Sequence, residues 1–252
     1  MKTVAMANMK GGVGKTSLSV TLAAELAKTD KTALLDFDPQ ANTTAWVAPE
    51  SAAIDIELAD VLQGKATVRD SFITTDIERL FLLPTYGNGG LKGYVENAGE
   101  LQINKAVKTL IGDIAKMNYA YCVIDLSPAF GKLERAALIT ATEAVTPILA
   151  DRFSLDGLET IAANLDELRG LVESPIAEYR RIIVNGMDGR IKRHAVILDS
   201  LKKGAKQSLY TIPIDQVFFR AQNESRAIQT MDAKPETLRE MARLADDIRG
   251  TK

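Results

Sequence analysis

A glycine-rich segment near the start of the chain has the composition of a phosphate-binding loop. It reads Gly-Gly-Val-Gly-Lys-Thr over residues 11–16, after a short apolar run at residues 3–7 and before helically spaced apolar residues at 17–28. Glycines let the backbone turn tightly and direct its N–H groups at phosphate oxygens, and the following helix adds the positive end of its dipole. In such a loop Lys15 reaches the outer phosphates and the Thr16 hydroxyl ligates Mg²⁺. The residues predicted to bind the phosphates are Gly11, Gly12, Val13, Gly14, Lys15, Thr16 and Ser17.

This loop departs from the general phosphate-loop pattern at one position. The pattern has a glycine, four further residues, and then Gly-Lys-Ser/Thr. Counting back from Gly14 puts Met9 where the first glycine would stand. The strand before the loop and the helix after it are both present, so we interpret the segment as a variant phosphate loop rather than a structural glycine turn.

Acidic residues end two of the predicted buried strands. Asp36 and Asp38 close the apolar run at residues 31–36, and Asp125 closes the run YAYCVID. In a parallel sheet the carboxyl ends of the strands bind ligands, so these acids and Lys15 share one edge. A spacing of two places Asp36 and Asp38 on one side of an extended chain. Acids at such an edge hold Mg²⁺ through water and orient an attacking water.

The elements that must position these residues follow from the pattern of apolar residues. The first 36 residues form a strand, turn, helix and strand, which begins a parallel sheet. Further strands are predicted at residues 80–83, 119–125, 143–149, 181–184 and 208–212, and helices at 58–62, 101–117, 155–171 and 235–248, with a basic helix between the last two strands and a loose glycine loop at 87–93. We therefore predict one doubly wound α/β domain over residues 1–252, with a mostly parallel sheet flanked by helices.

Composition excludes several classes of protein. The chain has 252 residues, of which 46% are hydrophobic, and a net charge of −2, so its bulk charge does not favour nucleic acid or acidic membrane. Its single cysteine, Cys122, cannot form an internal disulfide and lies in an apolar run. We find no signal segment at the start, and no apolar run of about 18 residues that would span a membrane.

One segment has a strong local charge. Residues 180–206 hold eight basic residues against two acidic ones, Asp188 and Asp199. The basic residues are Arg180, Arg181, Arg190, Lys192, Arg193, Lys202, Lys203 and Lys206. Two interpretations stay open: a solvated helix face, or a surface that binds an anion.

These motifs together resemble the ParA/MinD family of ATPases. The run KGGVGKT, which begins at Lys10, is similar to the family's deviant Walker A motif, and DFDPQAN at residues 36–42 is similar to its second motif. DLSP at residues 125–128 resembles the Walker B motif and the switch loop after it. IPID at residues 212–215, followed by Arg220 and Asn223, resembles a late segment near the nucleotide. The likeness extends from residue 3 to about residue 235, and its one departure is Ser127, where partition proteins commonly carry a proline.

The resemblance implies a dimer driven by ATP and Mg²⁺, with slow hydrolysis that a partner stimulates. Lys10 would be the signature lysine that reaches the partner's nucleotide and acts in catalysis beside Lys15. Asp38 would orient the hydrolytic water. Thr16, Asp36 and Asp125 would lie at the Mg²⁺ ion, and Asn185 and Pro213 would flank the adenine.

Within the family, the chain is most similar to the small, Soj-type ParA partition ATPases, because no helix-turn-helix extension precedes the first strand. That branch implies non-specific DNA binding by the ATP-bound homodimer, a ParB-like adaptor protein and a cytoplasmic, nucleoid-associated location. The cargo would be plasmid or chromosomal DNA, or a protein assembly. The candidate DNA contacts are Arg190, Lys192, Arg193, Lys202, Lys203 and Arg220.

Two other functions stay open. A MinD-like membrane-associated division regulator needs a C-terminal helix with basic and bulky apolar faces. Residues 238–252 carry three acids and no aromatic residue, so we expect a packed helix and no stable membrane association. A metabolic or redox enzyme of the same fold is the second alternative, although Cys122 alone cannot hold an iron–sulfur cluster. We expect the only histidine, His194, to be a basic surface residue rather than a catalyst.

Overall fold

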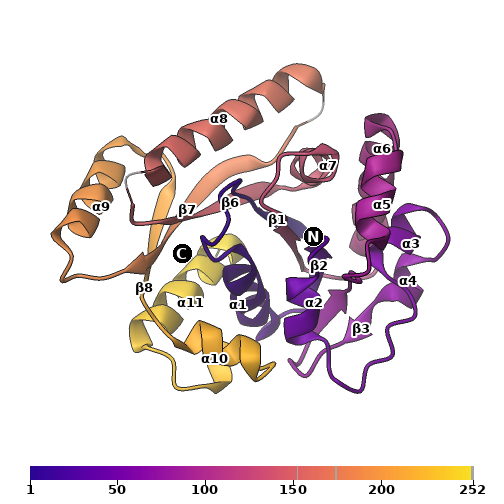
Figure 1. The fold of residues 1–252 in the computed structure, drawn as a ribbon, viewed down its shortest axis with the longest axis horizontal. Coiled ribbons are helices and arrows are strands. Elements are labelled where there is room, and N and C mark those ends of the chain that lie inside the picture. The colour runs from indigo at the N-terminus through magenta and orange to yellow at the C-terminus, as the bar shows by residue number, and fades with distance from the viewer. Residues whose placement is uncertain (152, 174, 251–252) are drawn as a thin grey trace.

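An eight-stranded sheet forms the centre of the molecule (Figure 1). The structure is a computed structural model, which describes residues 1–151, 153–173 and 175–250. The strands follow the order β3-β4-β2-β5-β1-β6-β7-β8 across the sheet, and β3 with β4 is the one antiparallel pair among them. Their bounds are β1 Lys2–Met6, β2 Thr32–Phe37, β3 Ile73–Thr74, β4 Leu80–Leu83, β5 Tyr121–Leu126, β6 Glu143–Leu149, β7 Glu178–Met187 and β8 Ser208–Pro213. The predicted mostly parallel α/β sheet is confirmed.

Helices cover both faces of the sheet, which explains why every residue of the central strands β2 and β5 is buried. One face packs against α1 (Lys15–Ala27), α2 (Asn42–Val47), α10 (Val217–Asn223), the 3-10 helix η1 (Ile228–Thr230) and α11 (Pro235–Arg249). The other face packs against α3 (Leu58–Leu62), α4 (Val68–Ser71), α5 (Gly90–Asn97), α6 (Glu100–Ala115), α7 (Lys132–Thr140) and α8 (Phe153–Leu171). Helix α9 (Lys192–Gly204) contributes Leu201 to a smaller cluster on β6 and β7.

Helices α5, α7 and α10 lie where the sequence pattern predicted none. The glycine loop expected at residues 87–93 ends at Gly89, which has a φ of 92° and is the N-cap of α5. Leu91 and Tyr94 are the buried residues of that helix. Helix α7 was missed because its buried positions include the small residues Ala136 and Ala137, which give a weak apolar period. This second error matters, because α7 follows directly on the candidate switch loop.

The C-terminal helix α11 uses its apolar face for internal packing. Met241, Leu244 and Ile248 are each at most 1% exposed and join the core cluster that contains α1. Arg249 ties the end of the helix to α1 by donating from Nη2 to the backbone oxygen of Glu25 at 2.7 Å. The expectation of a packed C-terminal helix is confirmed. Among the described residues, no helix is both long and apolar enough to cross a bilayer.

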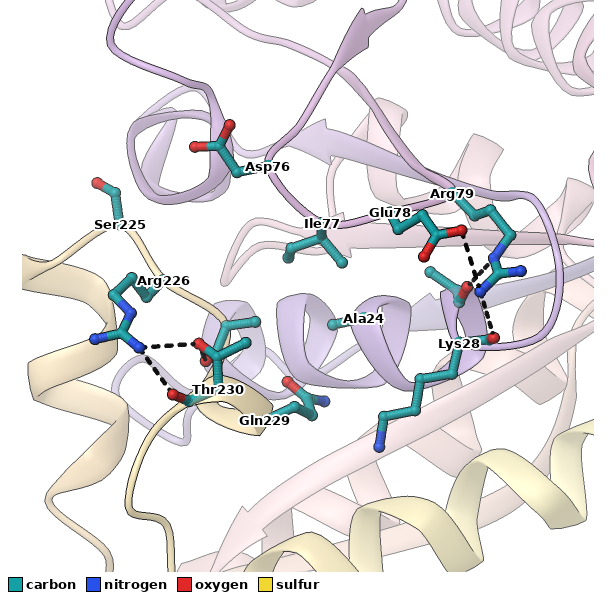
Figure 2. A pocket seen from close by; sticks show the side chains of 12 residues that line it. Ala24, Lys28, Asp76, Ile77, Glu78, Arg79, Ser225, Arg226, Gln229 and Thr230 are labelled. Carbon is teal, nitrogen blue, oxygen red and sulfur yellow. Dashed lines mark hydrogen bonds and ion pairs between the residues drawn. The ribbon is translucent and has the colours of Figure 1, made fainter.

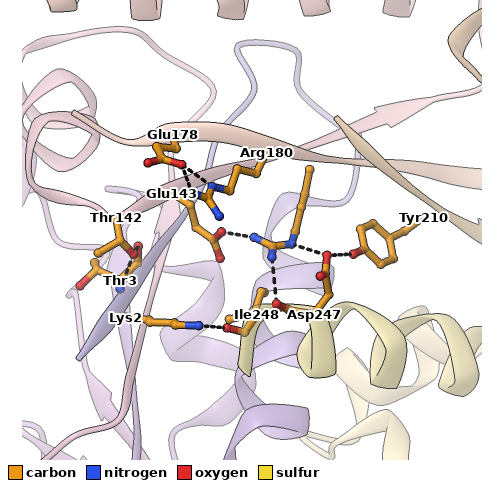
Figure 3. Close-up of polar contacts among 10 residues, drawn as sticks. Lys2, Thr3, Thr142, Glu143, Glu178, Arg180, Tyr210, Asp247 and Ile248 are labelled. Carbon is orange, nitrogen blue, oxygen red and sulfur yellow. Dashed lines mark hydrogen bonds and ion pairs between the residues drawn. The ribbon is translucent and has the colours of Figure 1, made fainter. Parts of the chain in front are cut away.

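A buried ion cluster lies at the edge of the sheet where the strands begin (Figure 3). We define it as Arg181, Glu143, Asp247 and Tyr210. The Arg181 guanidinium pairs with Glu143 and also donates from Nε to Oδ2 of Asp247 at 3.1 Å, while the Tyr210 hydroxyl donates to Asp247. Arg181 is only 6% exposed. The prediction that Arg181 belongs to a basic surface segment is wrong, because this residue is buried and its charge is opposed by Glu143 and Asp247.

Candidate nucleotide-binding site

The glycine-rich loop joins β1 to α1 at the edge where the strands end. Gly12 and Gly14 have φ angles of 72° and 91°, a left-handed conformation that favours glycine. A Cβ atom on Gly14 would also lie 2.4 Å from Nδ2 of Asn185. The backbone conformation therefore favours glycine at position 14, the N-cap of α1, and a side chain there would also displace the Asn185 amide.

A cavity of about 350 Å³ opens at this loop. Segments from the first loop, the end of β2, the loop after β5 and α10 meet around it. The residues that line it are Gly11, Gly12, Gly14, Lys15, Thr16, Ser17, Asp38, Gln40, Asn42, Pro128 and Gln222. The cavity therefore brings together most of the predicted phosphate contacts and one of the predicted acids.

Lys15 is a buried cation that points into this region. It is 7% exposed, and its Nζ donates to the backbone oxygen of Lys10 at 3.2 Å. Burial lowers the pKa of Lys15, while the negative charges of Asp125 and Asp38 oppose that shift. A phosphate oxygen in the cavity would offset the cost of burying this ammonium group.

Asp125 is the centre of a set of hydroxyl contacts. Its carboxylate accepts hydrogen bonds from Thr16 Oγ1 at 2.7 Å, Ser19 Oγ at 2.8 Å and Thr43 Oγ1 at 2.7 Å. Burial raises the pKa of Asp125, against the lowering effect of these three hydroxyl groups. Oxygen atoms from a carboxylate and a hydroxyl at the foot of a phosphate loop are the ligand type that Mg²⁺ takes. The residues present therefore fit the ion.

Asp36 and Asp38 have different surroundings, although both were predicted at this edge. Asp36 pairs in register with Asp125 on the next strand, and its Oδ2 accepts from Thr44 N at 2.8 Å and Thr44 Oγ1 at 2.7 Å. Burial, followed by the charge of Asp125, raises the pKa of Asp36 to about 7. Asp36 thus anchors α2 and does not line the cavity, whereas Asp38 lines it and accepts from Gln40 N at 2.9 Å.

Lys10 extends away from its own chain's cavity. Its Nζ lies 2.6 Å from Oδ2 of Asp151, just beyond the end of β6, and its side chain is 39% exposed. Its backbone N–H donates to Oδ1 of Asn8 at 2.8 Å. Lys10 is absent from the cavity lining, taken over the residues that the structure describes.

Neither candidate adenine contact lines the cavity in the part of the chain that the structure describes, and Asn185 contacts the loop beside it. Asn185, near the end of β7, donates from Nδ2 to the backbone oxygen of Val13 at 3.0 Å. Pro213 ends β8 and is in register with Met187. Asn185 therefore supports the loop, and both residues lie on strands that end at the same edge.

Comparisons with known proteins identify this arrangement. The family model described as an AAA domain matches residues 1–177. A chromosome-partitioning ATPase Soj from Treponema pallidum is 28% identical over 251 residues, which cover 98% of this chain and 96% of the relative. The chain belongs to the ParA/Soj/MinD family of P-loop ATPases.

Solved structures of this family share the fold. A plasmid partition protein from Borrelia burgdorferi bound to AMPPNP superposes with a TM-score of 0.83 at 22% identity, with 98% of each chain covered. The septum site-determining protein MinD of Pyrococcus horikoshii, complexed with Mg-ADP, gives a TM-score of 0.78 at 20% identity over 98% of this chain and 95% of that chain. At these identities the likeness demonstrates the fold alone.

Sequence reasoning missed several residues of this ParA-family site. Gln40, Asn42 and Pro128 stand within the quoted motifs, so their place in the lining could have been predicted from those motifs. Ser19 follows Thr16 by three residues on one helix face, which is a usable signal for their shared contact with Asp125. Gln222 could not be predicted, because only tertiary packing brings α10 to the cavity.

The candidate DNA contacts of this ParA-family chain are exposed and lie on or beside α9, apart from Arg220 on α10. Arg190 pairs with Asp188 at 2.7 Å, and Lys203 pairs with Asp199 at 2.6 Å. Arg220 donates from Nη2 to the backbone oxygen of Asp232 at 3.2 Å. Apart from Arg220, the candidates therefore lie on α9 and the turn before it, and two of them are paired with acids.

His194 corrects the sequence analysis. We expected a basic surface residue, but His194 is 7% exposed and its Nδ1 accepts a hydrogen bond from the backbone N–H of Asp188 at 3.1 Å. An imidazole nitrogen that accepts a hydrogen bond carries no proton. His194 therefore fixes the turn before α9 as a buried acceptor.

Proposed function

We propose that this ParA-family chain binds and hydrolyses ATP with Mg²⁺ and that ATP binding joins two chains into a dimer. The observation that supports this most strongly is the contact of Thr16 with Asp125 at 2.7 Å beside the buried Lys15. In this assignment the backbone of residues 11–17 and Lys15 hold the phosphates. Thr16 and Asp125 hold Mg²⁺, which neutralises charge on the phosphate oxygens when bound, and Asp36 supports the metal site from behind.

Asp38 is the residue to which we assign the hydrolytic water. It is the one strand-end acid of the three that lines the cavity, and the hydrogen bond from Gln40 fixes the direction of its carboxylate. A carboxylate in this position accepts a hydrogen bond from water and orients it toward the terminal phosphate. We place Asn185 and Pro213 beside the adenine.

Lys10 completes the site of a second copy in this proposal. Its side chain lies outside its own cavity, next to Asp151, so an ATP-bound partner must draw it from that contact. A cation donated across the dimer stabilises charge that develops in the transition state. Loss of the terminal phosphate removes the contacts that favour the dimer.

The Asp38→Ala variant tests hydrolysis. We expect it to bind ATP as the parent does and to accumulate as a dimer, because the acid that orients water is gone. Phosphate release and molecular mass are measured together, with Asp55→Ala as a control for loss of an exposed acid. Rapid phosphate release by Asp38→Ala would remove Asp38 from this role.

For the partner of the dimer, we propose DNA bound without sequence preference by α9 and Arg220, with a ParB-like adaptor for the cargo and a nucleoid-associated location. The exposed cations on one helix support this assignment. The MinD-like alternative is less well supported, because α11 buries its apolar face.

Charge reversal tests DNA binding. Arg190→Glu with Arg193→Glu should weaken DNA binding at least about tenfold and reduce its salt dependence, with ATP affinity kept. Lys105→Glu with Lys108→Glu on the exposed face of α6 is the matched control. An unchanged mobility shift for the first pair would exclude those residues from the interface.

A further inference from the structure

The two ends of the loop that follows β5 are held by one carboxylate, that of Glu134. Ser127 donates its hydroxyl hydrogen to Oε1 of Glu134, and the backbone N–H of Gly131 donates to Oε2 at 3.0 Å. Ser127 is 8% exposed and Glu134 is 6% exposed. Both oxygens of a buried carboxylate therefore hold residues 127–131, one at each end.

The tip of this loop faces the phosphate cavity. Pro128 lines the cavity, and both Pro128 and Ala129 are exposed. Asp125, two residues before Ser127, is fixed by its contact with Thr16. The loop thus has an exposed tip at the site and a buried anchor behind it, so the anchor determines where the tip lies.

Helix capping accounts for only half of this arrangement. A glutamate at the third helical position commonly accepts from the N-cap backbone N–H, and Glu134 does so with Gly131. Capping uses one oxygen and gives no reason for Ser127 to take the other. The Ser127 hydroxyl therefore adds a contact that capping of α7 does not need.

We propose that Ser127 and Glu134 are a positioning pair that holds the loop at residues 127–131 against the terminal phosphate of bound ATP. The inference rests on the proposed function, because it takes the cavity as the phosphate site. The pair acts on hydrolysis more than on binding, since Lys15 and Thr16 hold the nucleotide from a separate element. Hydrogen bonds to a buried carboxylate are strong enough to restrict a five-residue loop.

Steady-state ATP hydrolysis tests the pair. Ser127→Ala should lower kcat about fivefold to tenfold, the effect of losing one typical intramolecular hydrogen bond, and should leave KM within about twofold. Ser127→Thr keeps the hydroxyl and should recover kcat to within about twofold of the parent. Thr140→Ala is the control, because its hydroxyl donates to the Ala136 backbone oxygen within α7, away from the cavity.

Hydrogen exchange of the same loop, without nucleotide, gives a readout that does not depend on turnover. The amides of residues 129–131 should exchange about tenfold faster in Ser127→Ala than in the parent or in Ser127→Thr, while Pro128 has no amide hydrogen to report. If the parent itself does not hydrolyse ATP, the proposed function fails, while the exchange data still test the anchor.

Three results would overturn the pair when the parent is active. The first is a Ser127→Ala variant with the parent's kcat, whether or not the loop exchanges faster. The second is an equal loss of kcat in Ser127→Thr, which would exclude the hydroxyl as the cause. The third is unchanged exchange of the loop in Ser127→Ala.

Discussion

The two edges of the sheet bury acids in opposite ways. At the edge where the strands end, Asp125 is 0% exposed and is held by three hydroxyl groups, with no direct contact to a cation among the described residues. At the edge where the strands begin, Glu143 and Asp247 both contact the Arg181 guanidinium (Figure 3). The first edge has negative charge for a bound cation to neutralise, whereas at the second edge a cation of the protein already contacts both acids.

This difference separates a ligand site from a structural one within one fold. Hydroxyl groups satisfy hydrogen bonds but leave the charge of a carboxylate in place, so Asp125 and the neighbouring Lys15 gain from a metal ion and a phosphate. The Arg181 guanidinium opposes the charge of both acids and donates hydrogen bonds to them, so we assign no ligand to the ion cluster. Three predictions test this comparison.

The largest expected effect is on ATP affinity, at the edge of the sheet where the strands end. Lys15→Ala should lower ATP affinity at least about 100-fold, because it removes the buried cation at the phosphates. Isothermal titration calorimetry with Mg²⁺ and ATP measures the change. Lys28→Ala, just beyond the other end of α1, is the control and should bind ATP as the parent does. Parent-like affinity in Lys15→Ala would contradict the phosphate assignment.

The next effect is on stability at the opposite edge. Arg181→Met should lower the free energy of unfolding by about 3–5 kcal/mol, because it leaves buried Glu143 without its cation. ATP affinity should stay within about twofold. Urea unfolding can be followed by the fluorescence of Trp46, the only tryptophan, which is 1% exposed.

The neighbouring arginine provides the control for this change. Arg180 pairs with Glu178 on the surface, where both side chains are more than half exposed, so Arg180→Met should cost less than about 1 kcal/mol. Equal costs for Arg180→Met and Arg181→Met would mean that the ion cluster does not stabilise the fold through burial.

The smallest effect depends on pH. Burial, with the contact to Asp247, raises the pKa of Tyr210 to about 12 from its ordinary value of 10. Between these pH values the unfolded chain loses the phenol proton and the folded chain keeps it, so stability falls as pH rises. In the parent, this group lowers the free energy of unfolding by up to about 1.4 kcal/mol per pH unit. Tyr210→Phe should abolish that contribution. If the free energies of unfolding of the parent and of Tyr210→Phe fall equally between pH 10 and pH 12, the phenol of Tyr210 does not have the raised pKa.

A second cavity, away from both edges, is larger than the one at the glycine-rich loop, so cavity volume alone does not identify the nucleotide site. A cavity of about 560 Å³ lies between the end of α1, the segment before β4 and residues 225–230 (Figure 2). Its Arg79 side chain is already bonded to the backbone oxygens of Ala27 and Lys28, and Arg226 to that of Thr230. These cations are used within the fold, so we assign no ligand to this pocket.

The parts of the site that could be predicted from sequence are those that depend on short segments. The loop at residues 11–16 and the strand-end acids follow from local patterns, and the parallel register brings Asp36 beside Asp125 as expected. The sequence could not predict that Asp38 lines the cavity while Asp36 bonds to α2, because this depends on where α2 places Thr44. The burial of Arg181 could not be predicted either, because it depends on Glu143 and Asp247, which are distant in the chain.

The most direct test of the central claim is the molecular mass of the chain with Mg²⁺ and ATP, measured by sedimentation velocity. We predict that the parent doubles from 27.4 kDa with ATP and stays a monomer with ADP, and that Lys10→Ala stays a monomer with both. A parent that binds ATP without any change in mass, or a Lys10→Ala variant that dimerises as the parent does, would contradict the claim that Lys10 completes the site of a second copy.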